Sequence, residues 1–285
     1  MEKRAWIGGA AVILLALVAL AACSGGGKVL SRQEFRDAYA EAIKHAAPGV
    51  TVTPVAGDAL EVRRGDKDPA RARIDNAYAA YRANPRDLDE ILGHYAKLVA
   101  DAVDNEPTYA AEDLVVLVRP TTYAKGDPAL GAVEGPDGEP LTRPLAGDVL
   151  LIVAADRPDS FVLPAAGDLR ERLKLDAAAI WTRAAANTHA RLKGPAPTSK
   201  VDIVTTGEGI ASSLMAQDDY WDSPAMKARG ETVVSPIGRD RLVILHGPTA
   251  DEVAAWRRTA AEDDREDLLS QSLFVRRGGK WEPLP

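Results

Sequence analysis

The chain contains a single cysteine, Cys23, which directly follows a long uncharged segment at residues 5–22. One cysteine cannot form an intrachain disulfide, so the body of the protein must be stabilised by an apolar core. The uncharged segment follows the basic pair Lys3-Arg4 and ends in Ala21-Ala22. A basic start, an apolar stretch and small residues at the end are typical of a secretory signal. The alternative is an uncleaved membrane-spanning helix, since the segment is close to the shortest that crosses a bilayer.

The residues Leu20-Ala21-Ala22-Cys23 resemble the lipobox of bacterial lipoproteins. The resemblance implies cleavage before Cys23, lipid attachment to its sulfur, and acylation of the new amino terminus, for example with palmitate. Residues 1–22 are then a lipoprotein signal peptide, and residues 23–29 form a glycine-rich and therefore flexible lipidated tether. One myristoyl chain binds a membrane only marginally, whereas the two or three chains that the lipobox implies would anchor the protein stably.

The residue after the cysteine bears on the choice of membrane. In lipoprotein sorting, as this resemblance implies, an aspartate there favours retention in the inner membrane. Here the residue is Ser24, which favours the periplasmic face of an outer membrane. Cleavage would remove Glu2, Lys3 and Arg4, one negative and two positive charges, so the formal charge changes from −7 to −8. An acidic chain is poorly suited to nucleic acid, and we expect no such partner.

Helices and strands are predicted from the period of the apolar residues and from capping and turn signals. Helices are predicted at residues 31–47, 70–83, 87–103, 167–173 and 176–192, and from residue 249. Strands are predicted at residues 50–53, 59–62, 114–118, 149–154, 160–163, 201–205, 209–215, 231–236, 240–246, 273–277 and 280–284. Because most strands follow one another as hairpins, we expect an α+β fold of antiparallel sheets with packed helices.

The chain is expected to form two lobes. Residues 30–123 are predicted to form an N-terminal α+β lobe, and residues 148–285 a C-terminal α+β lobe. Residues 124–147 are rich in glycine and proline and show little periodicity, which predicts a long loop between the lobes.

Several short motifs occur together in this order. They are Val118-Arg119-Pro120, Asp148-Val149-Leu150-Leu151-Ile152-Val153, Phe161-Val162-Leu163-Pro164, Ala211-Ser212-Ser213-Leu214-Met215, Arg239-Asp240-Arg241-Leu242 and Phe274-Val275-Arg276-Arg277. This succession resembles the YtpQ family, an uncharacterised bacterial family, over residues 35–285. The resemblance implies no reaction. It marks Asn187, Ser212, Ser213, Arg239 and Asp240 as the characteristic polar positions.

Ser212 and Ser213 are the best candidates for a nucleophile. A serine nucleophile needs a base within reach and donors for an oxyanion. His246 or His189 could serve as the base, with Asp202 or Asp240 to orient it. The chain has no Gly-x-Ser-x-Gly elbow, however, so small residues at a close packing point are the favoured interpretation.

Arg239-Asp240 follows Ser235-Pro236-Ile237-Gly238 between two predicted strands. Arg239 could grip a carboxylate or a phosphate with two parallel hydrogen bonds. The alternative is an ordinary turn, because glycine and aspartate suit turn geometry.

The sequence predicts neither a metal nor a cofactor. The four histidines lack zinc-site spacing, and the acidic stretch 218–222 lacks the glycine and the spacing of a calcium loop. We therefore expect a non-catalytic, membrane-anchored envelope lipoprotein that binds a partner protein or an envelope ligand. The alternatives are a serine-dependent hydrolase of envelope material using Ser212 or Ser213, and a module that binds a small anion through Arg239.

Overall fold

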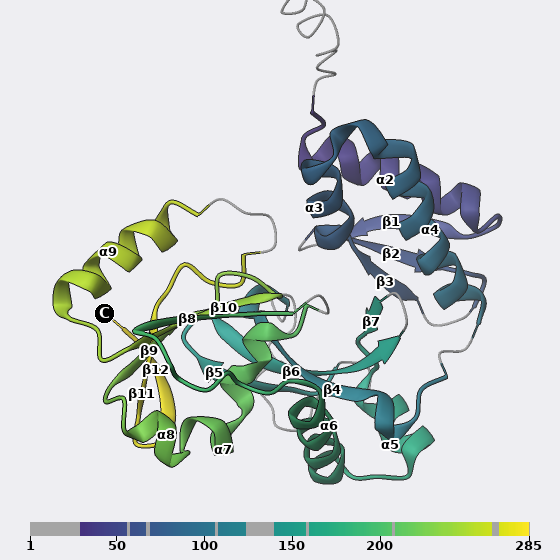
Figure 1. Ribbon diagram of the computed structural model, residues 1–285. Coiled ribbons are helices and arrows are strands. Elements are labelled where there is room, and N and C mark those ends of the chain that lie inside the picture. The colour runs from purple at the N-terminus through teal and green to yellow at the C-terminus, as the bar shows by residue number, and fades with distance from the viewer. Residues whose placement is uncertain are drawn as a thin grey trace, which may run out of the picture.

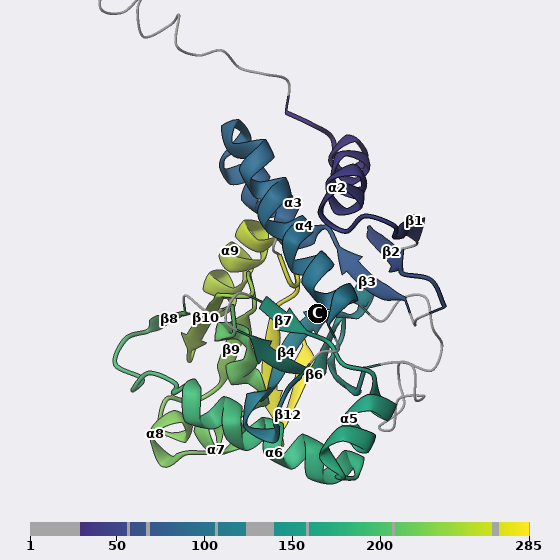
Figure 2. The same ribbon diagram turned by 90° about the vertical axis from the view of Figure 1, so that its right-hand side faces the viewer.

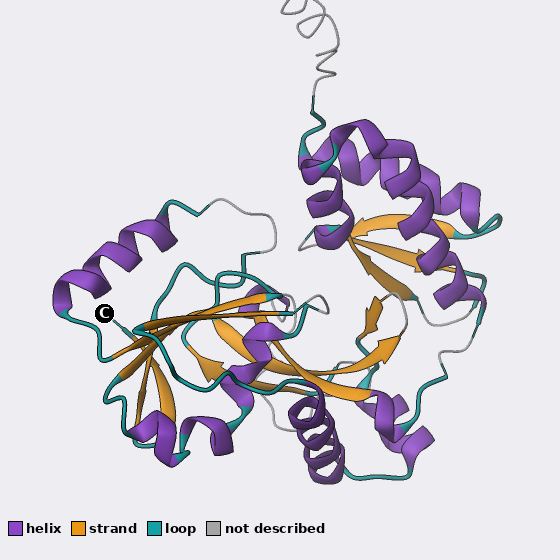
Figure 3. Cartoon of the chain, in the orientation of Figure 1, coloured by secondary structure: helices purple, strands orange, loops and turns teal. Residues whose placement is uncertain are grey.

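The computed structural model describes residues 29–55, 58–66, 69–105, 108–123, 140–157, 160–206, 209–263 and 268–284. The predicted signal peptide and Cys23 lie outside these residues. Within them, the chain forms no helix with the length and apolar character needed to cross a membrane. The strands form three antiparallel sheets, and helices pack beside them, which confirms the predicted α+β class (Figure 3).

The N-terminal lobe packs three helices against a three-stranded sheet, whose strands follow chain order (Figure 1). Ser31 and Glu34 form the predicted capping box, and the buried Phe35 ring packs on Tyr78 and Tyr81. The core of this lobe is drawn from residues 35–103 and is separate from the other cores. Its elements are α2 (Arg32–Ala46), β1 (Thr51–Val55), β2 (Ala59–Arg63), β3 (Ala70–Arg73), α3 (Asp75–Ala83), η1 (Pro85–Asp87) and α4 (Leu88–Asp104).

A four-stranded sheet begins the C-terminal lobe. Its strand order is β4-β6-β5, and β7 pairs with the end of β6. Helices α5 and α6 cover one face, where Leu114, Val116 and Val153 meet Ile180 and Trp181. The elements are η2 (Ala111–Asp113), β4 (Leu114–Pro120), η3 (Thr121–Tyr123), β5 (Thr142–Ala146), β6 (Val149–Arg157), β7 (Ser160–Val162), α5 (Ala166–Leu173) and α6 (Ala177–Arg191).

A five-stranded sheet with the order β12-β11-β9-β10-β8 completes the C-terminal lobe. Helix α9 covers one of its faces through Val253 and Trp256. The elements are β8 (Val201–Thr205), η4 (Ala211–Ala216), α7 (Asp218–Trp221), α8 (Pro224–Lys227), β9 (Thr232–Ser235), β10 (Arg241–His246), α9 (Ala250–Ala261), β11 (Phe274–Arg277) and β12 (Lys280–Pro283).

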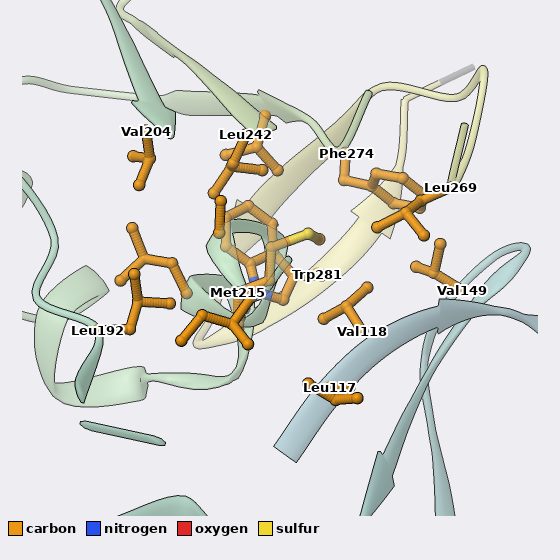
Figure 4. Packing of buried hydrophobic residues seen from close by; sticks show 14 of the residues in the cluster. Leu117, Val118, Val149, Leu192, Val204, Met215, Leu242, Leu269, Phe274 and Trp281 are labelled. Carbon is orange, nitrogen blue, oxygen red and sulfur yellow. Dashed lines mark hydrogen bonds between the residues drawn. The ribbon is translucent and has the colours of Figure 1, made fainter. Parts of the chain in front are cut away.

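The largest apolar core lies between these two sheets (Figure 4). Leu117 and Val149 enter it from the four-stranded sheet, and Leu242 and Phe274 enter it from the five-stranded sheet. Trp281 lies near its centre and donates its indole N–H to the carbonyl of Met215 over 2.9 Å. Because the partner of this buried donor is a backbone group of η4, the core fixes η4 between the two sheets.

The predicted boundary between the lobes differs from the one in the structure. Strand β4 falls in the range 30–123, yet it pairs along its length with β6 and so belongs to the C-terminal lobe. The predicted loop at 124–147 also contains β5, which pairs with β6. Pro144 is compatible with β5 because this strand lies at the edge of its sheet.

One predicted element is wrong in type, and another begins later than expected. Residues 209–215 were expected to form a strand, but Ala211–Ala216 is the 3-10 helix η4. Its alanine, serine, leucine and methionine side chains lack the β-branching that favours strands, and Ala211–Met215 is buried throughout. The helix expected at 70–83 begins only at Asp75, because Ala70–Arg73 pairs with β2 as β3.

Candidate functional site

Three arginines contact Tyr123 where the two lobes meet. Arg73 comes from β3 of the N-terminal lobe, Arg119 from β4, and Arg239 from the loop between β9 and β10. The guanidinium carbon of Arg73 lies 3.9 Å from the ring centroid of Tyr123. That of Arg239 lies 5.9 Å from it, and an Arg239 Nη donates to the Tyr123 hydroxyl over 2.8 Å. We call Arg73, Arg119, Arg239 and Tyr123 the arginine cluster.

Arg119 is the least expected member of the arginine cluster. It follows the apolar run of β4 and is only 5% exposed. One of its Nη atoms donates to the carbonyl of Val118 over 2.8 Å, and it also bonds Tyr123. Burial, and after it the nearby charge of Arg239, lower the pKa of Arg119 to about 10, while Tyr123 opposes the shift. The fold therefore holds a cation where a cation is costly.

No described carboxylate neutralises the charges of Arg119 and Arg239. Within the described part of the chain, neither Arg119 nor Arg239 forms an ion pair with an acidic side chain. The buried Nε of Arg239 also has no acceptor there. Arg73 does have a carboxylate partner, Asp75, at 2.8 Å, but Asp75 is shared with Arg32. Among the described residues, the arginine cluster thus carries more positive than negative charge, in a protein that is acidic as a whole.

The turn that carries Arg239 is held by Ser212. Gly238 and Arg241 close a hairpin whose two turn residues are Arg239 and Asp240, with the Gly238 N–H donating to the Arg241 carbonyl over 3.1 Å. The Ser212 hydroxyl lies 2.7 Å from the Gly238 carbonyl and 3.3 Å from the Arg241 carbonyl. The Asp240 carbonyl accepts from the N–H of Thr206 over 3.1 Å. These bonds fix the backbone from which Arg239 reaches Tyr123.

The N-terminal lobe contributes a second aromatic residue near Arg239. Tyr95 lies on α4, and burial raises its pKa, while the charge of Arg239 partly opposes that rise. Its carbonyl accepts a hydrogen bond from the Tyr39 hydroxyl over 3.2 Å. Figure 2 shows α4 standing above the strands of the C-terminal lobe. Both lobes therefore supply side chains to the surroundings of Arg239.

A small hollow lies at the carboxyl end of β4, the end that carries Arg119. It has a volume of about 160 Å³ and is lined by Thr121 and by apolar residues of β5 and β6. One of these, Leu150, lies directly opposite Arg119 in the ladder between β4 and β6. The hollow and the arginine cluster thus share the carboxyl end of β4.

Three other polar side chains bond to the backbone at the edge of β4. They belong to Asn187, Thr188 and Ser213. Along the free edge of β4, the Asn187 amide donates to the Leu114 carbonyl over 2.9 Å, and the Val116 N–H donates to the Thr188 hydroxyl over 2.8 Å. The Val118 N–H donates to the Ser213 hydroxyl over 3.3 Å. These side chains replace a missing neighbouring strand. Two of them, Asn187 and Ser213, are among the positions that the resemblance marks.

The arrangement required by the alternative hydrolase hypothesis is not assembled among the described residues. Ser212 and Ser213 are both 1% exposed and are bonded to backbone groups. His246 bonds Asp202 at 2.8 Å, and His189 bonds Gln217 at 3.1 Å. Neither histidine has a serine partner among the described residues. The serines therefore serve the fold, as the favoured interpretation of the sequence holds.

The acidic stretch 218–222 is neutralised in part by an arginine. Arg276 bonds Asp218 at 2.9 Å and Asp222 at 3.1 Å. Trp221 is buried and packs edge-on against Trp281 at 4.9 Å between centroids. Across the described ranges, no group of three or more potential metal ligands occurs.

Sequence reasoning missed three of the four members of the arginine cluster. Arg239 was singled out, but Arg73, Arg119 and Tyr123 were not. A usable signal did exist for Arg119. It shares the alternation of Val115 and Leu117, which face the apolar core between the sheets, so its side chain was bound to lie on a buried face. A charged residue at such a position is a functional candidate.

Comparison with known proteins adds no further assignment. No family model matches the chain, and neither a curated protein nor a solved structure matches it. Membership of the YtpQ family stays a prediction.

Proposed function

We propose that this chain is a lipid-anchored protein of the bacterial cell envelope that binds a small anion at the arginine cluster without transforming it. The observation that carries the proposal is the buried Arg119 guanidinium, which faces Arg239 without a carboxylate among the described residues. Buried charges in proteins are normally paired, because an unpaired charge costs several kcal/mol. A phosphate or carboxylate ligand would supply the missing negative charge.

The chemistry of the side chains favours an oxyanion. A guanidinium offers a planar fork of donors that matches phosphate and carboxylate groups. Arg239 has an unused buried Nε, and Tyr123 holds one of its Nη atoms in place. With the neighbouring serines engaged by the backbone, the site holds the ligand rather than attacking it.

Calorimetric titration of the full chain with inorganic phosphate, and separately with acetate, tests the site. The Arg239→Gln variant removes one charged donor, and we expect its Kd to rise by about tenfold or more, since such a bond contributes about 1.5–3 kcal/mol. Arg277→Gln is the matched control. Arg277 lies in the β11–β12 hairpin, is 52% exposed and bonds Glu231, which precedes β9. Equal Kd values for both variants and the wild type would rule out the site.

A second variant separates a ligand site from a structural cation. Arg119→Met removes the buried charge while keeping much of the volume. If the charge serves a ligand, the ligand-free variant unfolds at the same or a higher denaturant concentration and loses phosphate binding. A structural role predicts a clear loss of stability instead.

The lipid anchor is tested independently of the ligand. Cys23→Ala should release the protein from membranes and abolish the mass of the attached acyl chains. An unmodified thiol with residues 1–22 still attached would refute the anchor and leave the anion site untouched.

A further inference from the structure

Strand β8 is a free edge of the five-stranded sheet (Figures 1 and 2). Among the described residues it pairs with β10 alone. The Lys200 carbonyl and the Thr206 N–H bond to backbone groups on the β10 side. Because the direction of these groups alternates along a strand, the N–H and carbonyl groups of Val201, Ile203 and Thr205 point away from the sheet.

The side chains of β8 do not protect this edge. Val201 is 39% exposed and Ile203 is 57% exposed, and they are two of the three large apolar residues so exposed in the described part of the chain. The opposite edge, β12, carries Lys280, Glu282 and Pro283, residue types that block edge pairing. Strand β8 has neither proline nor lysine within it.

The one charge on β8 is already satisfied. Asp202 lies on the other face of the strand from Val201 and Ile203, as alternation requires. Its side chain is 11% exposed and bonds His246 at 2.8 Å. An incoming strand would therefore meet apolar and hydroxyl side chains on one face and, on the other, a carboxylate that is already hydrogen-bonded to His246.

We propose that β8 pairs in antiparallel fashion with β8 of a second copy of this chain, about a two-fold axis at Ile203. In this register Ile203 lies opposite its own copy, and Val201 lies opposite Thr205. Each of the three outward-facing residues then donates one backbone hydrogen bond and accepts another. Asp202 lies opposite Val204, so no two like charges face each other across the pair.

The self-complementary register is the reason for choosing a second copy as the occupant. All three outward-facing residues are β-branched, and pairs of such residues stabilise neighbouring strands. The two five-stranded sheets would join into one continuous sheet. A five-residue strand buries less than the roughly 800 Å² per partner of a standard interface. The dimer is therefore weak in dilute solution and forms where the chain is concentrated, which the membrane anchor of the proposed function would achieve.

Disulfide trapping in the full, lipid-carrying chain tests the register on vesicles of phosphatidylethanolamine and phosphatidylglycerol. Ile203→Cys should form a covalent dimer under mild oxidation, because paired residues lie at disulfide distance. Val201→Cys should link to Thr205→Cys in a mixture, and much less to itself. Ala185→Cys, exposed on α6, is the matched control, and the wild type, in which the sulfur of Cys23 carries the lipid, gives the background.

A charged residue introduced on the β8 edge should disrupt the same pairing. Ile203→Lys should abolish the link between Val201→Cys and Thr205→Cys, whereas Ala185→Lys should preserve it. Equal trapping of Ile203→Cys and Ala185→Cys, or self-linking of Val201→Cys as fast as its link to Thr205→Cys, would overturn the pairing. Vesicle flotation of each sample separates a failed anchor from failed pairing, because unanchored protein stays at the bottom of the gradient.

Discussion

Strands β4 and β8 both lie at the edge of a sheet in the C-terminal lobe, but they differ in whether their outer backbone groups are hydrogen-bonded within the described part of the chain. Along β4, side chains from α6 and η4 accept from or donate to the outward-facing groups of Leu114, Val116 and Val118. Along β8, the outward-facing groups have no such partners among the described residues, and apolar side chains stand exposed beside them.

The difference follows from burial. The edge of β4 is covered by a helix and has no access to water, so each outer N–H or carbonyl left unpaired would cost about 1–3 kcal/mol. The edge of β8 is accessible to water, which can satisfy its groups until a strand replaces it. Ser213, which resembles a candidate nucleophile in the sequence, thus satisfies a backbone group at an unpaired strand edge.

The largest expected contrast is in amide hydrogen exchange of the dilute, detergent-solubilised chain. The amides of Val116 and Val118 should exchange only on global opening, about 1,000-fold or more slower than exposed amides. The amides of Ile203 and Thr205 should exchange quickly, while that of Val204 is slowed by β10. Strong protection of Ile203 in this sample would mean that its edge is covered within one chain, and the contrast would fail.

Thr188→Val should lower the free energy of unfolding by about 1–3 kcal/mol, because it leaves the buried Val116 N–H without an acceptor. Denaturant unfolding measures the effect. Thr182→Val on the same helix is the control, since Thr182 makes the same bond to the carbonyl four residues earlier but is exposed. A loss of equal size in both variants would show that the helix, rather than the β4 edge, needs the hydroxyl.

Ser213→Ala should cost about 1 kcal/mol, less than Thr188→Val, because its bond to Val118 is longer at 3.3 Å. Phosphate affinity should not change. The adjacent Ser212→Ala should instead weaken phosphate binding, because Ser212 positions the turn of Arg239. Measuring both properties for both variants would show whether the two serines have separate tasks, and reversed effects would contradict the assignment.

The smallest effect is expected for Ile203→Thr. An exposed residue with no buried contacts should change the unfolding free energy of the dilute monomer by no more than about 0.5 kcal/mol. A larger loss, measured by the same denaturant titration, would indicate that Ile203 packs within its own chain.

Much of the fold could be predicted from local signals. The capping box at Ser31 and the terminal hairpin around Gly278-Gly279 depend on neighbouring residues alone, and both form as expected. The sheet membership of β4 could not be predicted, because its pairing with β6 crosses the whole segment between them. The strand expected at 209–215 was a wrong prediction, because a short run of residues that is buried on all sides gives the same apolar pattern in a strand and in a tight helix.

The arginine cluster was predicted only at Arg239, for a related reason. Its members are separated by tens of residues and come from both lobes, so no spacing rule links them. Ser212 and Ser213 were singled out because serine can act as a nucleophile. In the structure, Ser212 bonds two backbone carbonyls and Ser213 accepts from a backbone amide. Burial of a charge, rather than the presence of a reactive group, was the informative signal.

The ring of Tyr123 lies between a cation of the N-terminal lobe and a cation of the C-terminal lobe. Each lobe has its own interior, so two separately produced fragments would each retain what is needed to fold. Neither fragment would hold the complete set of arginines. Recovery of phosphate binding on mixing would then report the reassembly of the halves, and the ligand itself would act as a reversible clamp between them.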